Sequence, residues 1–136
     1  MEFGIWNLVL VWHLVLTRGG FMEKKYDLED RTELFAKKII MLCKKIEYST
    51  TSQELIKQMV RAGTSVGANY REANEAVGKN DFLYRLRIAR KEAKEVEYWL
   101  SLAQTADATC NDIAGELRRE AVELRNILSS ILAKSE

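Results

Sequence analysis

The chain has 136 residues, of which 47% are hydrophobic and 30% are charged, which fits a single globular domain with a buried core. It contains no proline and is rich in Ala, Leu, Glu, Lys and Arg, so long uninterrupted helices are favoured. Because the net charge is only +1 and the single histidine is His13, composition alone identifies no charged partner and excludes a histidine-based site in residues 22–136.

Residues 5–16 form a strongly apolar run near the N-terminus. The run is shorter than the ~20 residues that a membrane-spanning helix needs, and the acidic Glu2 and the absence of an Ala-x-Ala pattern argue against a signal peptide. Residues 18–20 (Arg-Gly-Gly) would be encoded by purine-rich codons, where a bacterial ribosome-binding site would precede Met22. We therefore expect residues 1–21 to be a leader outside the native protein, with no membrane contact; a signal peptide or anchor is the alternative.

The first helix is predicted to begin near Asp27, in a domain that covers residues 22–136. Acidic residues near its start and Lys44 and Lys45 near its end suit the helix dipole. Apolar residues recur at helical spacing, namely Leu28, Phe35, Ile39, Leu42 and Ile46. Residues 48–52 (Tyr-Ser-Thr-Thr-Ser) then read as a loop with candidate N-caps for the next helix.

The second helix combines an apolar stripe with a stretch of small residues. The stripe consists of Leu55, Ile56, Met59, Gly63, Val66, Tyr70 and Ala73. Glycine in a helix interior costs ~1 kcal/mol relative to alanine, so Gly63 and Gly67 are expected to allow another helix to approach closely. A ligand pocket lined by Thr64, Ser65 and Asn69 is the alternative, although the hydroxyls can also bond to carbonyls one turn earlier.

The third helix is predicted to follow a break, with Gly78 ending the second helix and Asn80 or Asp81 capping the third. Its apolar stripe is Phe82, Leu86, Ala89, Ala93, Val96, Leu100 and Ala103. The opposite side is basic, and between Arg85 and Lys94 five basic residues accompany one acid. Ile88 and Trp99 lie on a flank where a single bundle offers no obvious contact, which indicates an oligomer interface.

The fourth helix is expected to follow a loop and cap at residues 109–112 (Thr-Cys-Asn-Asp). Its apolar stripe is Ile113, Leu117, Ala121, Leu124, Leu128 and Ile131. Four amphipathic helices joined by short loops predict an all-α fold, an antiparallel up-down-up-down four-helix bundle.

No residue pattern indicates a cofactor, a metal or catalysis. Cys43 and Cys110 match no metal spacing and are expected to be free, structural thiols in a reducing cytoplasm, with Cys43 buried; a single long-range disulfide is the alternative. Di-metal bundles require Glu-x-x-His motifs, and residues 22–136 have no histidine. The chain also lacks a phosphate-binding glycine loop and a nucleophile elbow. We therefore expect a cytoplasmic protein that is not an enzyme.

Several ordered motifs make the chain resemble the bacterial four-helix bundle family, also called S23 or 23S rRNA intervening-sequence proteins. The resemblance rests on residues 26–29 (Tyr-Asp-Leu-Glu), 61–73 (Arg-Ala-Gly-Thr-Ser-Val-Gly-Ala-Asn-Tyr-Arg-Glu-Ala), 81–93 and 95–100. It implies a homopentameric four-helix bundle. Some members are encoded inside intervening sequences of ribosomal RNA genes. Related accessory proteins of diversity-generating retroelements bind nucleic acid and a reverse transcriptase. One departure is that Asp30-Arg31-Thr32 follows the first motif, where the family commonly has an aromatic residue.

The resemblance and the basic faces together predict a non-enzymatic oligomer that binds structured RNA or DNA. Phosphate contacts would come from Lys57, Arg61, Arg71, Arg87, Arg90, Lys91 and Lys94. Exposed tyrosines could add stacking on bases, although Tyr70, Tyr84, Tyr98 and Trp99 at helical spacing also fit a core or an interface. The plainer interpretation is a solvated exterior balanced by neighbouring glutamates. A protein-binding adaptor or accessory subunit without nucleic-acid contact is the alternative function.

Overall fold

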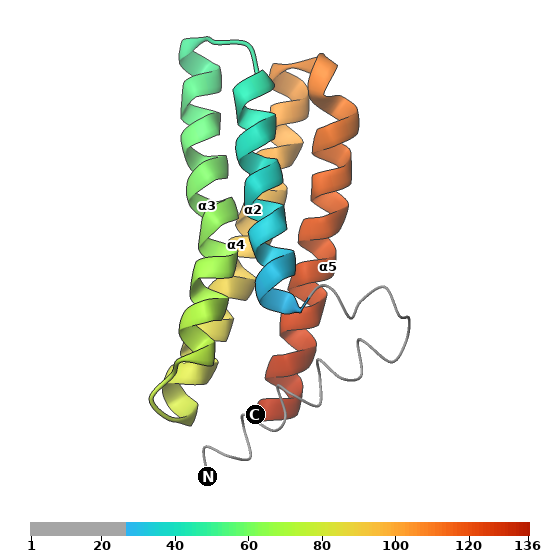
Figure 1. The fold of residues 1–136 in the computed structure, drawn as a ribbon. Helices are drawn as coiled ribbons and strands as arrows, with labels where there is room; N and C mark the ends of the chain where they lie inside the picture. Colours follow the sequence, from blue (N-terminus) through green and yellow to red (C-terminus); the bar gives the residue numbers. More distant parts are fainter. Residues whose placement is uncertain (1–26) are drawn as a thin grey trace.

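The computed structural model describes residues 27–136, which are almost wholly helical. The helices are α2 (Leu28–Lys45), α3 (Thr50–Asn74), α4 (Lys79–Ala106) and α5 (Asn111–Ser135), with a 3-10 turn, η2 (Ala108–Cys110), before α5. Successive helices run in alternate directions (Figure 1). The prediction of an all-α antiparallel four-helix bundle is confirmed, whereas the apolar leader and its proposed boundary at Met22 lie outside the described residues.

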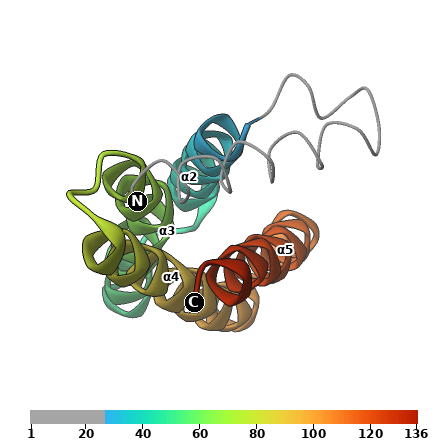
Figure 2. The same ribbon diagram turned by 90° about the horizontal axis from the view of Figure 1, so that it is seen from below.

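The helices follow one another around the bundle in chain order (Figure 2). Helix α4 has the largest contacts, with α3 on one side and α5 on the other, while α2 and α5 share a much smaller one. The predicted stripes of α2 and α4 are fully buried. Leu55 and Ile56 of α3 and Ile113 of α5 are only half-buried because they lie near the first turns of their helices, where fewer neighbouring residues cover them.

The small residues of α3 lie where this helix meets α2. A Cβ atom added to Gly63 would be 3.0 Å from Cγ1 of Ile39, and one added to Gly67 would be 2.9 Å from Oγ1 of Thr32. Thr32 cannot move aside cheaply, because it is buried and its hydroxyl donates to the carbonyl oxygens of Leu28 (2.9 Å) and Glu29 (3.0 Å). The two glycines thus permit an interhelical approach that any side chain would obstruct.

Two predicted helix ends differ from the structure. Helix α3 already ends at Asn74, and Gly78 is instead the N-cap residue of α4, with a φ of 92° that suits glycine. Asp81 lies within α4 and accepts a hydrogen bond from the Val77 N–H (3.2 Å), so it holds the entering loop without being the cap residue. Residues 109–112 do contain the N-cap residue of α5, Cys110, as predicted, although no side chain caps this helix; Asp107 caps the preceding turn η2.

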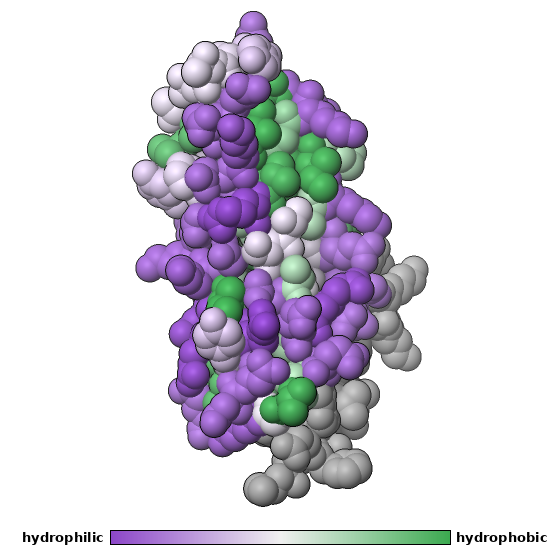
Figure 3. All heavy atoms as spheres, turned by 90° about the vertical axis from the view of Figure 1, so that its left-hand side faces the viewer, coloured by the Kyte–Doolittle hydropathy of each residue, from purple (hydrophilic) through white to green (hydrophobic). Residues whose placement is uncertain are grey.

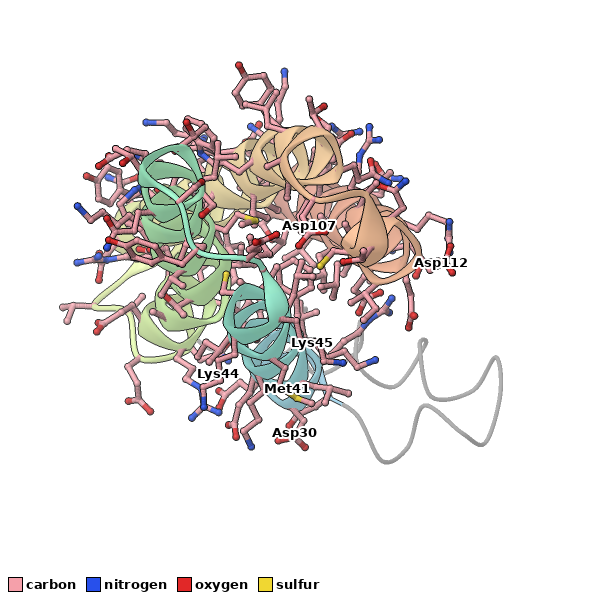
Figure 4. All side chains as sticks on the ribbon, turned by 90° about the horizontal axis from the view of Figure 1, so that it is seen from above. Asp30, Met41, Lys44, Lys45, Asp107 and Asp112 are labelled. Atoms are coloured by element: carbon pink, nitrogen blue, oxygen red, sulfur yellow. The ribbon has the colours of Figure 1, made fainter. Side chains whose placement is uncertain are left out.

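Asp107 connects the two loops at one end of the bundle. Its carboxylate accepts hydrogen bonds from the Thr109 hydroxyl (2.6 Å) and from the Glu47 N–H of the α2–α3 loop (3.3 Å). Figure 4 shows Asp107 between that loop and the start of α5, while Met41 and Lys44 project away from α2. The hydrogen bond from Thr109, followed by that from Glu47, lowers the pKa of Asp107 below its ordinary value.

Candidate nucleic-acid interface

The seven basic residues predicted to contact phosphate lie on two helices and differ in their partners. Lys57, Arg61 and Arg71 belong to α3, and the other four, Arg87, Arg90, Lys91 and Lys94, belong to α4. In the sequence these seven residues look alike. In the structure they differ in whether an acidic side chain lies beside them.

The arginines of α3 join this helix to its neighbours. Arg61 donates to Glu92 of α4 (Nη1 to Oε2, 3.2 Å) and also to Glu95, and Arg71 donates to Glu33 of α2 (Nη2 to Oε2, 2.7 Å). Lys57 has a looser pair with Glu54 one turn earlier, at 3.5 Å. Exposed pairs of this kind contribute ~0–1 kcal/mol each. Their larger consequence is that these cations already have anionic partners.

The outer face of α4 presents cations with fewer partners. Arg87 reaches only Glu136 at the chain end (3.1 Å), and within residues 27–136 no ion pair forms to Arg90, Lys91 or Lys94. The acids that flank this face have other partners, because Glu95 binds Arg61 and the Trp99 indole. The positive charge of this face is therefore left uncompensated by neighbouring side chains.

Helix α5 adds basic residues that sequence reasoning missed. Arg118 lines a shallow surface hollow together with Lys91, Lys94, Glu95, Glu97, Tyr98 and Ser101 of α4. Its guanidinium lies 3.6 Å from Glu97, which also approaches Arg125 (3.5 Å), while the neighbouring Arg119 lines the next hollow along α5. The adjacent pair Arg118-Arg119 was a usable signal, since an up-down bundle must place α5 beside α4.

The polar residues of the small-residue stretch are satisfied within α3. Thr64 donates to the carbonyl oxygen of Val60 (2.7 Å), Ser65 to that of Arg61 (2.6 Å), and Asn69 to that of Ser65 (2.9 Å). These bonds follow the pattern expected for hydroxyl and amide groups inside a helix. They leave no polar group of this stretch directed toward a ligand, so the stretch serves helix packing.

The predicted oligomer contacts, Ile88 and Trp99, are both half-buried residues of α4. Trp99 packs partly against the bundle core, and its indole N–H donates to Glu95 (3.1 Å). A single subunit thus uses Trp99, contrary to the expectation that it has no contact there. Its role in an interface between subunits stays a prediction, as does that of Ile88.

Helix α2 exposes three large apolar side chains. Leu34, Ile40 and Met41 are each at least 39% exposed, and Met41 reaches 59%. Figure 3, which looks onto the α3 side of the bundle, shows a mainly hydrophilic face with some apolar groups in its upper half. Leu34 and Met41 are seven residues apart and share one side of α2, and exposed apolar groups on one side of a helix are typical of a contact surface for another protein chain.

Other kinds of site find little support in residues 27–136. No group of three or more Cys, Asp, Glu or His side chains is arranged to hold a metal ion, and no helix there has the length and hydropathy to cross a membrane. Both cysteines are free thiols, as predicted, and both are buried. Burial raises the pKa of the Cys43 thiol to about 11, which is the behaviour of an inert packing residue.

Comparison with known proteins decides the family. The family described as 23S rRNA-intervening sequence protein matches residues 24–130. The chain belongs to this family. The match covers all four helices apart from the last residues of α5, and the family description names no reaction.

A solved structure supports the same assignment. It is that of a protein with unknown function from the S23 ribosomal protein family of Bacteroides thetaiotaomicron, with 34% sequence identity and a TM-score of 0.69. The alignment covers 78% of this chain and 98% of the other. No curated protein sequence matches the chain.

Proposed function

We propose that this 23S rRNA-intervening sequence family member is a non-enzymatic homo-oligomer, a pentamer as its resemblance implies, that binds RNA or DNA through the outer basic face of α4. The observation that carries the proposal is the group of three cations, Arg90, Lys91 and Lys94, which have no ion-pair partner among the described residues. Each phosphate neutralised by such a group releases condensed counterions, which drives binding without base-specific contacts.

Oligomerisation strengthens this mechanism. One bundle presents a short basic face, whereas a ring of subunits repeats it and adds the phosphate contacts of each copy. The exposed Leu34, Ile40 and Met41 of α2 offer apolar surface for such assembly. The same surface favours the second candidate function, an adaptor that binds a protein such as a reverse transcriptase and makes no nucleic-acid contact.

The test is binding of a mixed RNA pool to the full chain at low salt, followed by fluorescence anisotropy and by light scattering for oligomeric state. A variant with Arg90, Lys91 and Lys94 all changed to Gln should bind at least ~10-fold more weakly, and its salt dependence should fall by about two units of slope. A control with Lys37, Lys57 and Arg71 changed to Gln has the same change in net charge, yet its cations have partners.

Equal losses in the two variants would show that only net charge matters and would contradict an interface on α4. An oligomer that ignores RNA and DNA at low salt would leave the protein adaptor as the function. A monomer would contradict the proposed assembly.

A further inference from the structure

The outer face of α4 carries two exposed tyrosines in line with its cations. At steps of three and four residues along the helix it presents a stripe that we call the α4 ridge, consisting of Tyr84, Arg87, Lys91, Lys94 and Tyr98. At 100° per residue these positions fall within about 80° of one another, so they share one line of the helix surface. The ridge thus has a basic centre between two aromatic ends.

Burial separates these tyrosines from the other aromatic residues within the helices. Tyr70 is fully buried and Trp99 packs partly against the core, whereas Tyr84 is 58% exposed and Tyr98 56% exposed. The two ridge tyrosines are therefore the aromatic side chains of α4 that a partner can reach. A single exposed apolar group is common on protein surfaces, but two exposed tyrosines aligned with three cations indicate a binding surface.

The local contacts of the two rings hold them in place and leave stacking surface. Tyr98 meets Trp99 edge to face, with ring centroids 5.1 Å apart and planes at 64°. The Arg85 guanidinium lies 5.8 Å from the centroid of Tyr84. Either contact uses at most one face of its tyrosine ring, so each ring keeps a face for a further planar group. Beside Tyr98 the hollow shared with Lys91, Lys94 and Arg118 provides space for such a group.

The combination is particular to α4. The outward stripes of the other long helices all contain acids, namely Asp30 and Glu33 in α2, Glu54 and Glu72 in α3, and Asp112 in α5. The α4 ridge contains none, and the flanking Glu95 and Glu97 are held by arginines of α3 and α5. A polyanion lying along the ridge therefore meets cations and aromatic rings, while the nearby acids Glu95, Glu97 and Glu136 are each paired with an arginine.

We propose that the α4 ridge binds a single-stranded segment of nucleic acid, whose phosphates contact Lys91 and Lys94 while unpaired bases stack on Tyr98 and Tyr84. The inference rests on the proposed function and specifies its ligand as unpaired strand. The tyrosines are fourteen residues apart, ~21 Å along the helix, which is the length of about six stacked nucleotides. Bases in a duplex already stack on one another, so a duplex can use the cations of the ridge but not its rings.

The experiment compares three ligands by fluorescence anisotropy with the full chain at low salt. They are a fluorescein-labelled oligouridylate, an abasic oligomer with the same number of phosphates, and the oligouridylate paired with oligoadenylate. Wild-type protein should bind the oligouridylate at least ~10-fold more tightly than the abasic oligomer, because only the former offers bases to stack. The single strand should also bind more tightly than the duplex.

Substitutions assign the difference to the tyrosines. Changing Tyr84 and Tyr98 to Ala should weaken oligouridylate binding ~10-fold or more and leave abasic binding within about 2-fold, whereas the Phe double variant should bind like wild type. Tyr48→Ala is the matched control, because Tyr48 is 76% exposed but lies in the α2–α3 loop.

The outcomes separate this inference from the function on which it rests. Equal wild-type affinity for the base-containing and abasic strands would overturn base stacking while leaving phosphate binding intact. Absence of binding to all three ligands would overturn the proposed function and the inference together. The wild-type comparison needs no variant, so it decides the matter even if an alanine variant fails to fold.

Discussion

The α2–α3 seam and the outer face of α4 use similar residues for different purposes. In the seam, Arg71 is bound to Glu33, and Gly63 and Gly67 let α2 pack within contact of the α3 backbone. On α4, Lys91 and Lys94 project beside an exposed tyrosine with no acid bound to them among the described residues. A basic residue on a bundle surface is thus available to a partner only where adjacent helices provide no carboxylate.

The largest expected effect concerns the chemical reactivity of the buried thiol of Cys43. Cys43 is buried in α2 and its pKa is raised to about 11, so at about pH 8 its thiolate should be ~100-fold scarcer than that of a free cysteine. Iodoacetamide should therefore modify it only through unfolding. Peptide mass mapping in native buffer and in urea checks this; rapid modification of native protein would mean that the packed side opens readily.

A change at Gly67 tests how tightly the seam is packed. Gly67→Ala should lower the free energy of unfolding by ~1–2 kcal/mol, because the clash with Thr32 outweighs the gain in helix propensity. Gly115→Ala is the matched control: its Cβ would lie 3.6 Å from the nearest atom outside its own helix turn, so up to ~1 kcal/mol of stabilisation is expected. Urea unfolding measures both, and equal shifts would contradict the close approach.

Replacing one basic residue of α3 and one of α4 tests directly whether the two helices use their cations differently. Arg71→Gln should lower the free energy of unfolding by ~0.5–1 kcal/mol through loss of its pairs with Glu33 and Glu29, whereas Lys94→Gln should change it by less than ~0.5 kcal/mol. RNA affinity should respond in the opposite order. A destabilised Lys94 variant with unchanged RNA binding would reverse our assignment of the two faces.

The smallest effect is expected at Asp107, outside both regions. Because the fold lowers its pKa, ionised Asp107 stabilises the protein above its ordinary pKa of 3.8, and this contribution is lost as the pH falls through the lowered native value. The stability difference between wild type and Asp107→Asn should therefore shrink on acidification. Urea unfolding at neutral and acidic pH measures it, and a constant difference would show that the charge contributes nothing.

Much of the fold was predictable because it depends on local patterns. Apolar residues at helical spacing located all four helices, and the glycines of α3 indicated a close approach, although not which helix approaches. The break at Gly78 was located correctly, yet the role of the glycine was not. Whether a glycine ends one helix or begins the next depends on backbone angles that the residue type permits equally.

The sequence by itself determined the number and order of the helices, the residues facing the core and the basic character of α4. Tertiary structure alone decided that Arg61 and Arg71 are bound by acids of neighbouring helices, that Trp99 packs against the core, and that Arg118 lies beside Lys94. The physical reason is the separation in sequence of the residues that interact. Helix formation and amphipathic patterning depend on residues three and four apart, whereas the partner of an exposed charge depends on which side of a distant helix faces it.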